Sequence, residues 1–378
     1  MAFYIDNQLY FDFYVNGYSV PVTLTDINSM VITSNCYDIL PALRLDINDN
    51  KGIFSQGLLV DGTTISIAVG TDQNNASENM MEFIYSTSPE EVKSKAKDRY
   101  LIYATYNYPK LRCMEPIGIY GTSSQALTNI ASKVGLATDV KYTSDEMVWL
   151  NGTRNYGEFI KYITSYGYID DTSCMMSCID LNRKLLYKDI NSLKYDYTFT
   201  EAPVEDMISS KKVQFNEIEF ANNSAINNYT YGYQNILTDY SLSGDINSFN
   251  KISFNKDSTA LNINSKIFND TGNIRNSFMA TNLGNVHKNW ARAYYQNLRY
   301  RSLYSIQAKV YCYKKTPLNV LDGVNLSLID PITTQVDTVK SSKWLITSKS
   351  IGISNKQYIE KYGIATTGLN MDLFNNLM

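Results

Sequence analysis

The stretch TSSQALTNIASKVG, residues 122–135, marks the point where the hydrophobic spacing of the chain changes from every second residue to every third or fourth. The Thr122 hydroxyl and the Gln125 amide can each satisfy a backbone N–H at a helix start, which is the pattern of a capping box. Gly135 favours the left-handed conformation that ends many helices. The stretch therefore predicts an amphipathic helix. Its predicted inner face consists of Leu127, Ile130, Ala131 and Val134.

A second helix is predicted to start at Asn155, which pairs with Glu158 in the same capping pattern, and to end at Gly167. Three strand-like segments lie beside these helices, at 147–150, 174–179 and 184–189. Helical spacing and strand-like segments occur together within this short stretch, which indicates one small folding unit. We therefore predict a small α+β domain over residues 117–205.

The region before this unit carries the signals of strands. Residues 11–15 alternate apolar and polar side chains, and Asp61-Gly62 is a tight-turn signal between two apolar runs. A charged segment at 89–99 differs, and we interpret it as a helix. Several short strands joined by polar turns predict an antiparallel β-barrel domain over residues 1–116.

Strand signals return in the last third of the chain. Residues 306–312 alternate cleanly, the Asp322-Gly323 turn precedes another alternating run, and a hairpin is predicted around Ser354-Asn355. We predict a second antiparallel β-barrel domain made of residues 206–238 and 303–368. The fold class is therefore mainly β, with two β-barrel domains, a small α+β domain and an insertion.

Two segments fall outside these domains. Residues 239–302 are rich in Asn and Ser and end in a helical pattern, so we interpret them as an insertion domain with a helix. Residues 369–378 are apolar for a chain end, and we expect this C-terminal tail to dock on a partner. The candidate interface residues are Leu369, Met371, Leu373, Phe374 and Leu377.

Composition narrows the classes of function. The chain has 378 residues, 34 Lys and Arg against 37 Asp and Glu, and a net charge of -3, which argues against nonspecific nucleic-acid binding. The chain has a single histidine, His287, so most zinc sites and Ser-His catalytic pairs are excluded. Cys174 and Cys178 lack further ligands, so we interpret them as core thiols. We expect a protein that is not an enzyme, with no cofactor, metal, signal peptide or membrane-spanning segment.

A stripe of basic side chains lies on one face of the helix predicted within the insertion, and it has two explanations. Lys288, Arg292 and Arg299 recur at nearly one azimuth of the helix predicted within the insertion, with Tyr295 beside them. Phosphate contacts and base stacking would make these residues candidates for contact with nucleic acid. A solvated helix face explains the same pattern and is the commoner case.

Two regions together resemble the central baseplate hub proteins of contractile-tailed bacteriophages and related injection systems. In that family a Gly-Leu pair, a Trp and a Tyr- or Phe-rich helix precede a two-stranded ribbon; here Gly135-Leu136, Trp149 and the 174–189 ribbon follow that order. The second region is LDGVNL at 321–326 with WLIT at 344–347 and KQY at 356–358, similar to the closing strands of the hub barrels. Many relatives carry a His where this chain has Gly352.

The resemblance implies a fold with two barrels like those of tail-tube proteins, and a homotrimer whose six barrels form a ring. Such a hub joins a hexameric tail tube to a trimeric central spike and encloses a channel for DNA, with Lys288, Arg292 and Arg299 as candidate channel contacts. The implied partners are the tube protein, the spike protein and other baseplate proteins. The implied location is the virion tail baseplate, assembled in the host cytoplasm. Two alternatives stay open: a tail-associated cell-wall hydrolase and a carbohydrate-binding host-recognition protein.

Overall fold

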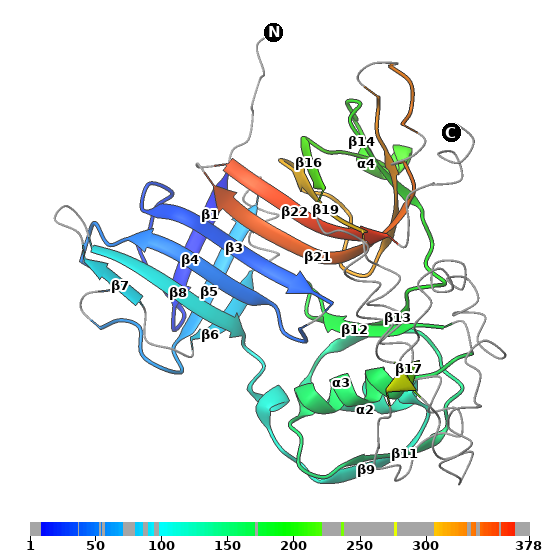
Figure 1. Ribbon diagram of the computed structural model, residues 1–378. Coiled ribbons are helices and arrows are strands. Elements are labelled where there is room, and N and C mark those ends of the chain that lie inside the picture. The colour runs from blue at the N-terminus through cyan, green and yellow to red at the C-terminus, as the bar shows by residue number, and fades with distance from the viewer. Residues whose placement is uncertain are drawn as a thin grey trace.

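The computed structural model describes residues 9–220 and 306–366, with short gaps, and the strand pair β17 (Ile236–Leu237) and β18 (Asn276–Ser277). The gaps fall at 37, 53, 55–56, 71–79, 86–89, 94–97, 171–172, 331–333, 338–340 and 355–356. Figure 1 shows strands as the dominant element, with two helices gathered in one small unit. The prediction of a mainly β fold with an α+β unit is confirmed.

The predicted α+β unit forms as the capping signals indicate. Thr122 caps α2 through the Gln125 N–H, Asn155 caps α3 through the Glu158 N–H, and both capping boxes are complete. Gly135 ends α2 in the left-handed conformation, with φ of 82°. The elements of this unit are β9 (Ile117–Gly121), α2 (Ser123–Val134), β10 (Ala137–Val140), β11 (Met147–Asn151), α3 (Tyr156–Tyr166), β12 (Met175–Ile179) and β13 (Lys184–Asp189).

The first β unit precedes it and ends in a short 3-10 turn. Its elements are β1 (Tyr10–Val15), β2 (Tyr18–Ser19), β3 (Ile27–Asn35), β4 (Ala42–Asn48), β5 (Thr64–Gly70), β6 (Met81–Tyr85), β7 (Glu90–Lys93), β8 (Asp98–Tyr106) and η1 (Pro109–Arg112). The predicted helix at 89–99 is wrong, because β7 pairs antiparallel with the start of β8. Pairing with β8, the next strand along the chain, overrides the helical preference of a charged segment.

The second β unit is assembled from two stretches of the chain. Its elements are β14 (Tyr197–Thr200), α4 (Met207–Ser210), β15 (Lys212–Gln214), β16 (Glu217–Phe220), β19 (Ile306–Cys312), β20 (Gly323–Ser327), β21 (Lys343–Ser354) and β22 (Gln357–Thr366). β15 pairs with β14 and the following β16 pairs with β19, so residues 212–220 bridge two edges of this unit. Phe199, Val310 and Trp344 are buried inside it.

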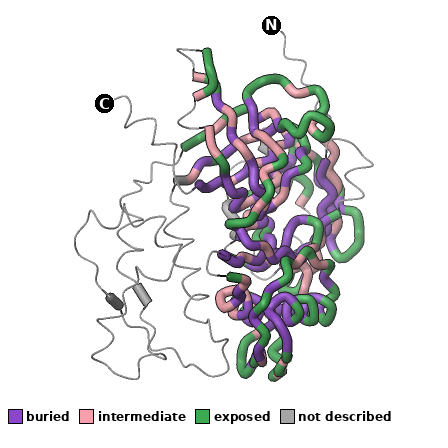
Figure 2. The backbone as a smooth tube through the Cα atoms, turned by 90° about the vertical axis from the view of Figure 1, so that its right-hand side faces the viewer, coloured by how far each residue is buried: buried purple, intermediate pink, exposed green. Residues whose placement is uncertain are grey.

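The two β units share one sheet. β3 of the first unit pairs antiparallel with β21 of the second over seven residue pairs, from Ser29 with Ser354 to Asn35 with Ser348. This pairing merges the strands into a single 15-stranded sheet, and among the described strands neither of the two predicted barrels is closed by hydrogen bonds. In Figure 1, β3 and β21 lie side by side where the two units meet. Figure 2 shows buried residues, in purple, throughout the described part of the chain.

The α+β unit contacts both β units through the turn between β12 and β13. The Ser34 hydroxyl donates to the Ile179 carbonyl at 2.7 Å, which ties the turn to the first unit. The Asn319 amide donates to Asp180 at 2.6 Å, which ties it to the second. Of the helices in the described residues, none combines the length and apolarity needed to cross a bilayer.

Candidate functional site

The surface along the β3–β21 pair is the first candidate site. Opposite residues of antiparallel strands share a face, so Val31 and Thr33 lie on the same face as Gly352 and Ser350. The Thr33 and Ser350 hydroxyls are 2.9 Å apart and link the two β units. We call this surface the joined face. Its central residues are Val31, Thr33, Asn35, Ala42, Ser348, Ser350, Gly352 and Gly363.

The joined face is uncharged at its centre and charged toward its sides. All eight central residues are neutral, and most of them are small. Arg44 lies on β4, 5.9 Å from the ring of Tyr103, and Lys361 lies on β22, 5.4 Å from the ring of Tyr311. Gly352 permits the close approach of the strands, because a Cβ there would lie 2.8 Å from the Met30 carbonyl oxygen. Val31 is 38% exposed, whereas Ser350 and Gly352 are buried, so this face presents small neutral groups and no group suited to catalysis.

A buried charged cluster lies behind the joined face, between the two cores. Glu360 accepts hydrogen bonds from the Tyr358 and Tyr362 hydroxyls, both at 2.7 Å, and from the Thr316 N–H at 3.0 Å. Its carboxylate is 3.6 Å from the ammonium of Lys349. Burial raises the pKa of both tyrosines well above its usual range, and the Glu360 charge raises it further. Glu360 is fully buried and only 8% of the Lys349 surface is exposed, so we interpret the cluster as structural.

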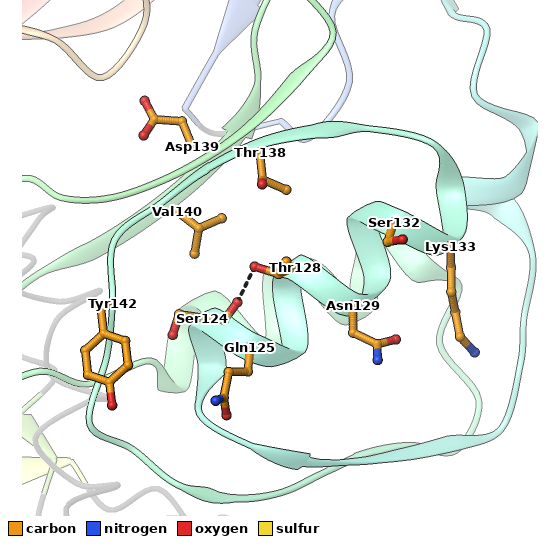
Figure 3. Close-up of a pocket in the computed structure, with 10 residues that line it drawn as sticks. All are labelled: Ser124, Gln125, Thr128, Asn129, Ser132, Lys133, Thr138, Asp139, Val140 and Tyr142. Atoms are coloured by element: carbon orange, nitrogen blue, oxygen red, sulfur yellow. Dashed lines mark hydrogen bonds between the residues drawn. The ribbon is translucent and has the colours of Figure 1, made fainter.

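The second candidate site is a groove between α2 and β10, drawn in Figure 3. Its volume is about 1010 Å³. One wall is the outer face of the helix, and the other is the edge strand β10 and the residues after it. The lining residues are Ser124, Gln125, Thr128, Asn129, Ser132, Lys133, Thr138, Asp139, Val140 and Tyr142. Hydroxyl and amide groups dominate this lining, and a nucleophile with a neighbouring base is not among them.

Four of the five cysteines are buried, and Cys174 and Cys178 are core thiols as the sequence predicts. Cys174 and Cys178 are buried in one cluster with Cys36, and Cys312 is buried in the core of the second unit. Burial raises the pKa of the Cys178 and Cys312 thiols, which keeps them protonated and unreactive. Cys113 is exposed. In the described residues, no group of three or more His, Cys, Asp or Glu side chains could hold a metal ion.

The predicted site residues themselves lie outside the described residues. These are Lys288, Arg292 and Arg299 of the basic stripe, His287, and the tail residues Leu369, Met371, Leu373, Phe374 and Leu377. Sequence reasoning did not find either surface described above. The alternation in β3 and β21 was visible, but it does not say which strand pairs with which.

Comparison with known proteins identifies solved structures with a similar fold. No family model matches the chain, and no curated protein matches its sequence. Among solved structures, the 43 kDa tail protein of prophage MuSo2 from Shewanella oneidensis is similar with a TM-score of 0.59 and 10% identity, over 95% of this chain and 99% of that one. A tail protein from Neisseria meningitidis MC58 is similar with a TM-score of 0.55 and 10% identity, over 94% of this chain and 96% of that one.

The chain therefore has the fold of a phage tail protein. Both similarities extend over nearly the whole length of each chain, so they include both β units and the α+β unit of this chain. The resemblance predicted from the sequence is confirmed at the level of the fold.

Proposed function

We propose that this protein is a non-enzymatic structural hub of a phage tail baseplate. In the proposed assembly, three copies form a ring that joins the hexameric tail tube to the trimeric central spike and encloses a channel for DNA. Tube, spike and other baseplate proteins are the proposed partners. The proposed location is the tail of the virion, after assembly in the host cytoplasm.

The observation that carries the proposal is the β3–β21 pairing within a fold shared with tail proteins. It makes the two β units of one chain adjacent segments of a single wall. A closed symmetric ring needs such repeated segments, because each copy must present complementary edges to the next. The uncharged centre of the joined face also suits a channel wall, since a dense basic surface would hold a polyanion by phosphate contacts.

The candidate channel contacts Lys288, Arg292 and Arg299 belong to the proposal, as does docking of the C-terminal tail. Removing residues 369–378 is expected to weaken binding to the spike partner while leaving the melting temperature of the chain unchanged. If the shortened chain binds the spike as tightly as wild type does, the tail has no docking role. A lowered melting temperature of the shortened chain would instead show that the tail stabilises the fold.

The experiment that tests the assembly is light scattering of the full chain, alone and with its spike partner, followed by negative-stain imaging. We expect a species of three times the 43.0 kDa chain mass, seen end-on as a ring with a central opening. A chain that stays monomeric at high concentration with and without the spike would refute the proposal. Hydrolysis of bacterial peptidoglycan by the purified chain in a zymogram would refute the proposal that the protein is not an enzyme.

A further inference from the structure

β10 leaves one edge of the α+β sheet unpaired. The sheet order is β10, β13, β12, so β10 has one neighbour among the described strands. The Lys141 N–H donates to the Tyr187 carbonyl at 2.7 Å, in the parallel register that pairs Val140 with Tyr187. Alternate residues of a strand direct their backbone groups to opposite sides. Thr138 and Val140 therefore direct their N–H and C=O groups away from β13.

The unpaired edge borders the groove beside α2. Figure 3 shows Thr138 and Val140 across the groove from the helix residues Ser124 and Thr128. The four residues of β10 span about 13 Å at ~3.3 Å each. The helix wall from Ser124 to Lys133 spans about the same length at ~1.5 Å per residue. The groove thus has the length of about four residues of extended chain.

The helix wall offers neutral hydrogen-bonding groups. The Oε1 atom of Gln125 accepts the Thr122 N–H at 3.0 Å, which leaves its NH₂ group available. Asn129 and Ser132 follow on the same helix face, and neither side chain has a hydrogen bond within the described residues. An exposed helix face normally carries several charges, whereas Lys133 is the only charged residue of α2.

The charges around the groove already have partners. Lys133 lies 3.3 Å from Glu115, and Asp139 lies 3.8 Å from Lys188. At one end, Tyr142 exposes 71% of its surface and can cover a bound side chain. A charged ligand would therefore find no free counter-charge among the described lining residues, while a neutral polar one would find hydrogen bonds along its length.

We propose that this groove binds an extended segment of a partner protein, with uncharged polar side chains, that adds as a strand to the free edge of β10. Strand addition beside a helix combines backbone hydrogen bonds, which give affinity, with side-chain contacts, which give selectivity. Thr138 and Val140 supply the backbone donors and acceptors. Gln125, Asn129 and Ser132 contact side chains of the bound segment. The inference does not depend on the proposed ring.

The test uses peptides selected from a display library of random ten-residue sequences on the full chain. Enriched peptides are synthesised and their affinities measured by fluorescence anisotropy. Val140→Pro removes the N–H on the open edge but none of the bonds to β13, which is the position that a strand edge tolerates for proline. We expect it to weaken binding about tenfold or more, because several edge contacts depend on one register.

Two exposed tyrosines make a matched pair of controls. Tyr142→Ala is expected to weaken binding severalfold, whereas Tyr18→Ala, at a residue 79% exposed on the distant β2, should leave binding unchanged. Asn129→Leu, on the exposed face of α2, provides a test should Val140→Pro fail to fold. Hydrogen exchange of the 137–142 segment should slow in the complex. The proposal fails if no peptide is enriched, or if the selected peptides bind the folded Val140→Pro or Asn129→Leu chain as tightly as wild type.

Discussion

Glu360→Gln tests whether the buried charged cluster holds the second β unit against the first. The change keeps the shape of the side chain and removes its charge. Three hydrogen bonds to the carboxylate, from Thr316, Tyr358 and Tyr362, then lose their charge assistance. Hydrogen bonds to charged groups contribute about 1 kcal/mol more than neutral ones, so the three together imply a loss of about 3 kcal/mol. The Lys349 ammonium keeps its hydrogen bond to the Leu318 carbonyl at 2.7 Å but also loses its counter-charge, which adds to the loss.

The assay is thermal unfolding at neutral pH, monitored by tryptophan fluorescence. A loss of about 3 kcal/mol should lower the midpoint of the affected transition by roughly 6–12 °C. Glu219→Gln is the matched control, since Glu219 also accepts a tyrosine hydroxyl, from Tyr311, and pairs with Lys309 at the surface. An exposed pair contributes at most about 1 kcal/mol, so this control should barely move the midpoint. Equal shifts in the two variants would refute the reasoning.

Three further changes are predicted from single contacts. Gly352→Ala should destabilise the β3–β21 pairing by about 1–3 kcal/mol, because its Cβ would lie 2.8 Å from the Met30 carbonyl oxygen; an unchanged urea midpoint would contradict this. The hydrogen bond from Arg99 holds the pKa of Asp46 below its ordinary 3.8, so the contribution of Asp46 to stability is present above that pH and lost as pH falls through the lowered pKa. Unfolding curves of Asp46→Asn and wild type should therefore differ at pH 7 and converge in acid. Tyr85→Phe should raise stability by about 1 kcal/mol, because the buried Tyr85 hydroxyl has no hydrogen-bond partner in the described residues; a lower melting temperature would count against it.

The sequence predicts well those parts of the fold that short-range signals determine. Both capping boxes and the left-handed Gly135 occur where the residues indicate them, since a cap depends on side chains within three positions of the helix start. The predicted inner face of α2 is also correct, since Leu127, Ile130, Ala131 and Val134 are buried. Phe159, Ile160 and Ile163 of α3 are buried, as the helical spacing requires.

Pairing between distant strands could not be predicted in the same way. The alternation in β3 and β21 indicates a strand in each case, but their pairing joins residues more than 300 positions apart. The helix predicted at 89–99 failed for a different reason, because β7 pairs with β8 locally, between residues only 5 to 11 positions apart. The groove also escaped prediction, since it depends on β10 being an edge strand. Alternation identifies a strand but leaves its neighbours undetermined.

The antiparallel pairing of β16 with β19 has a consequence for how this architecture can vary in length. Phe220 at the end of β16 lies opposite Ala308 near the start of β19, so the chain leaves the second β unit and re-enters it at adjacent points. The cost of closing a loop grows only slowly with its length, so a short turn or an entire foreign domain could occupy this position. Both evolution and protein engineering could therefore replace the segment between β16 and β19 and keep the second β unit unchanged.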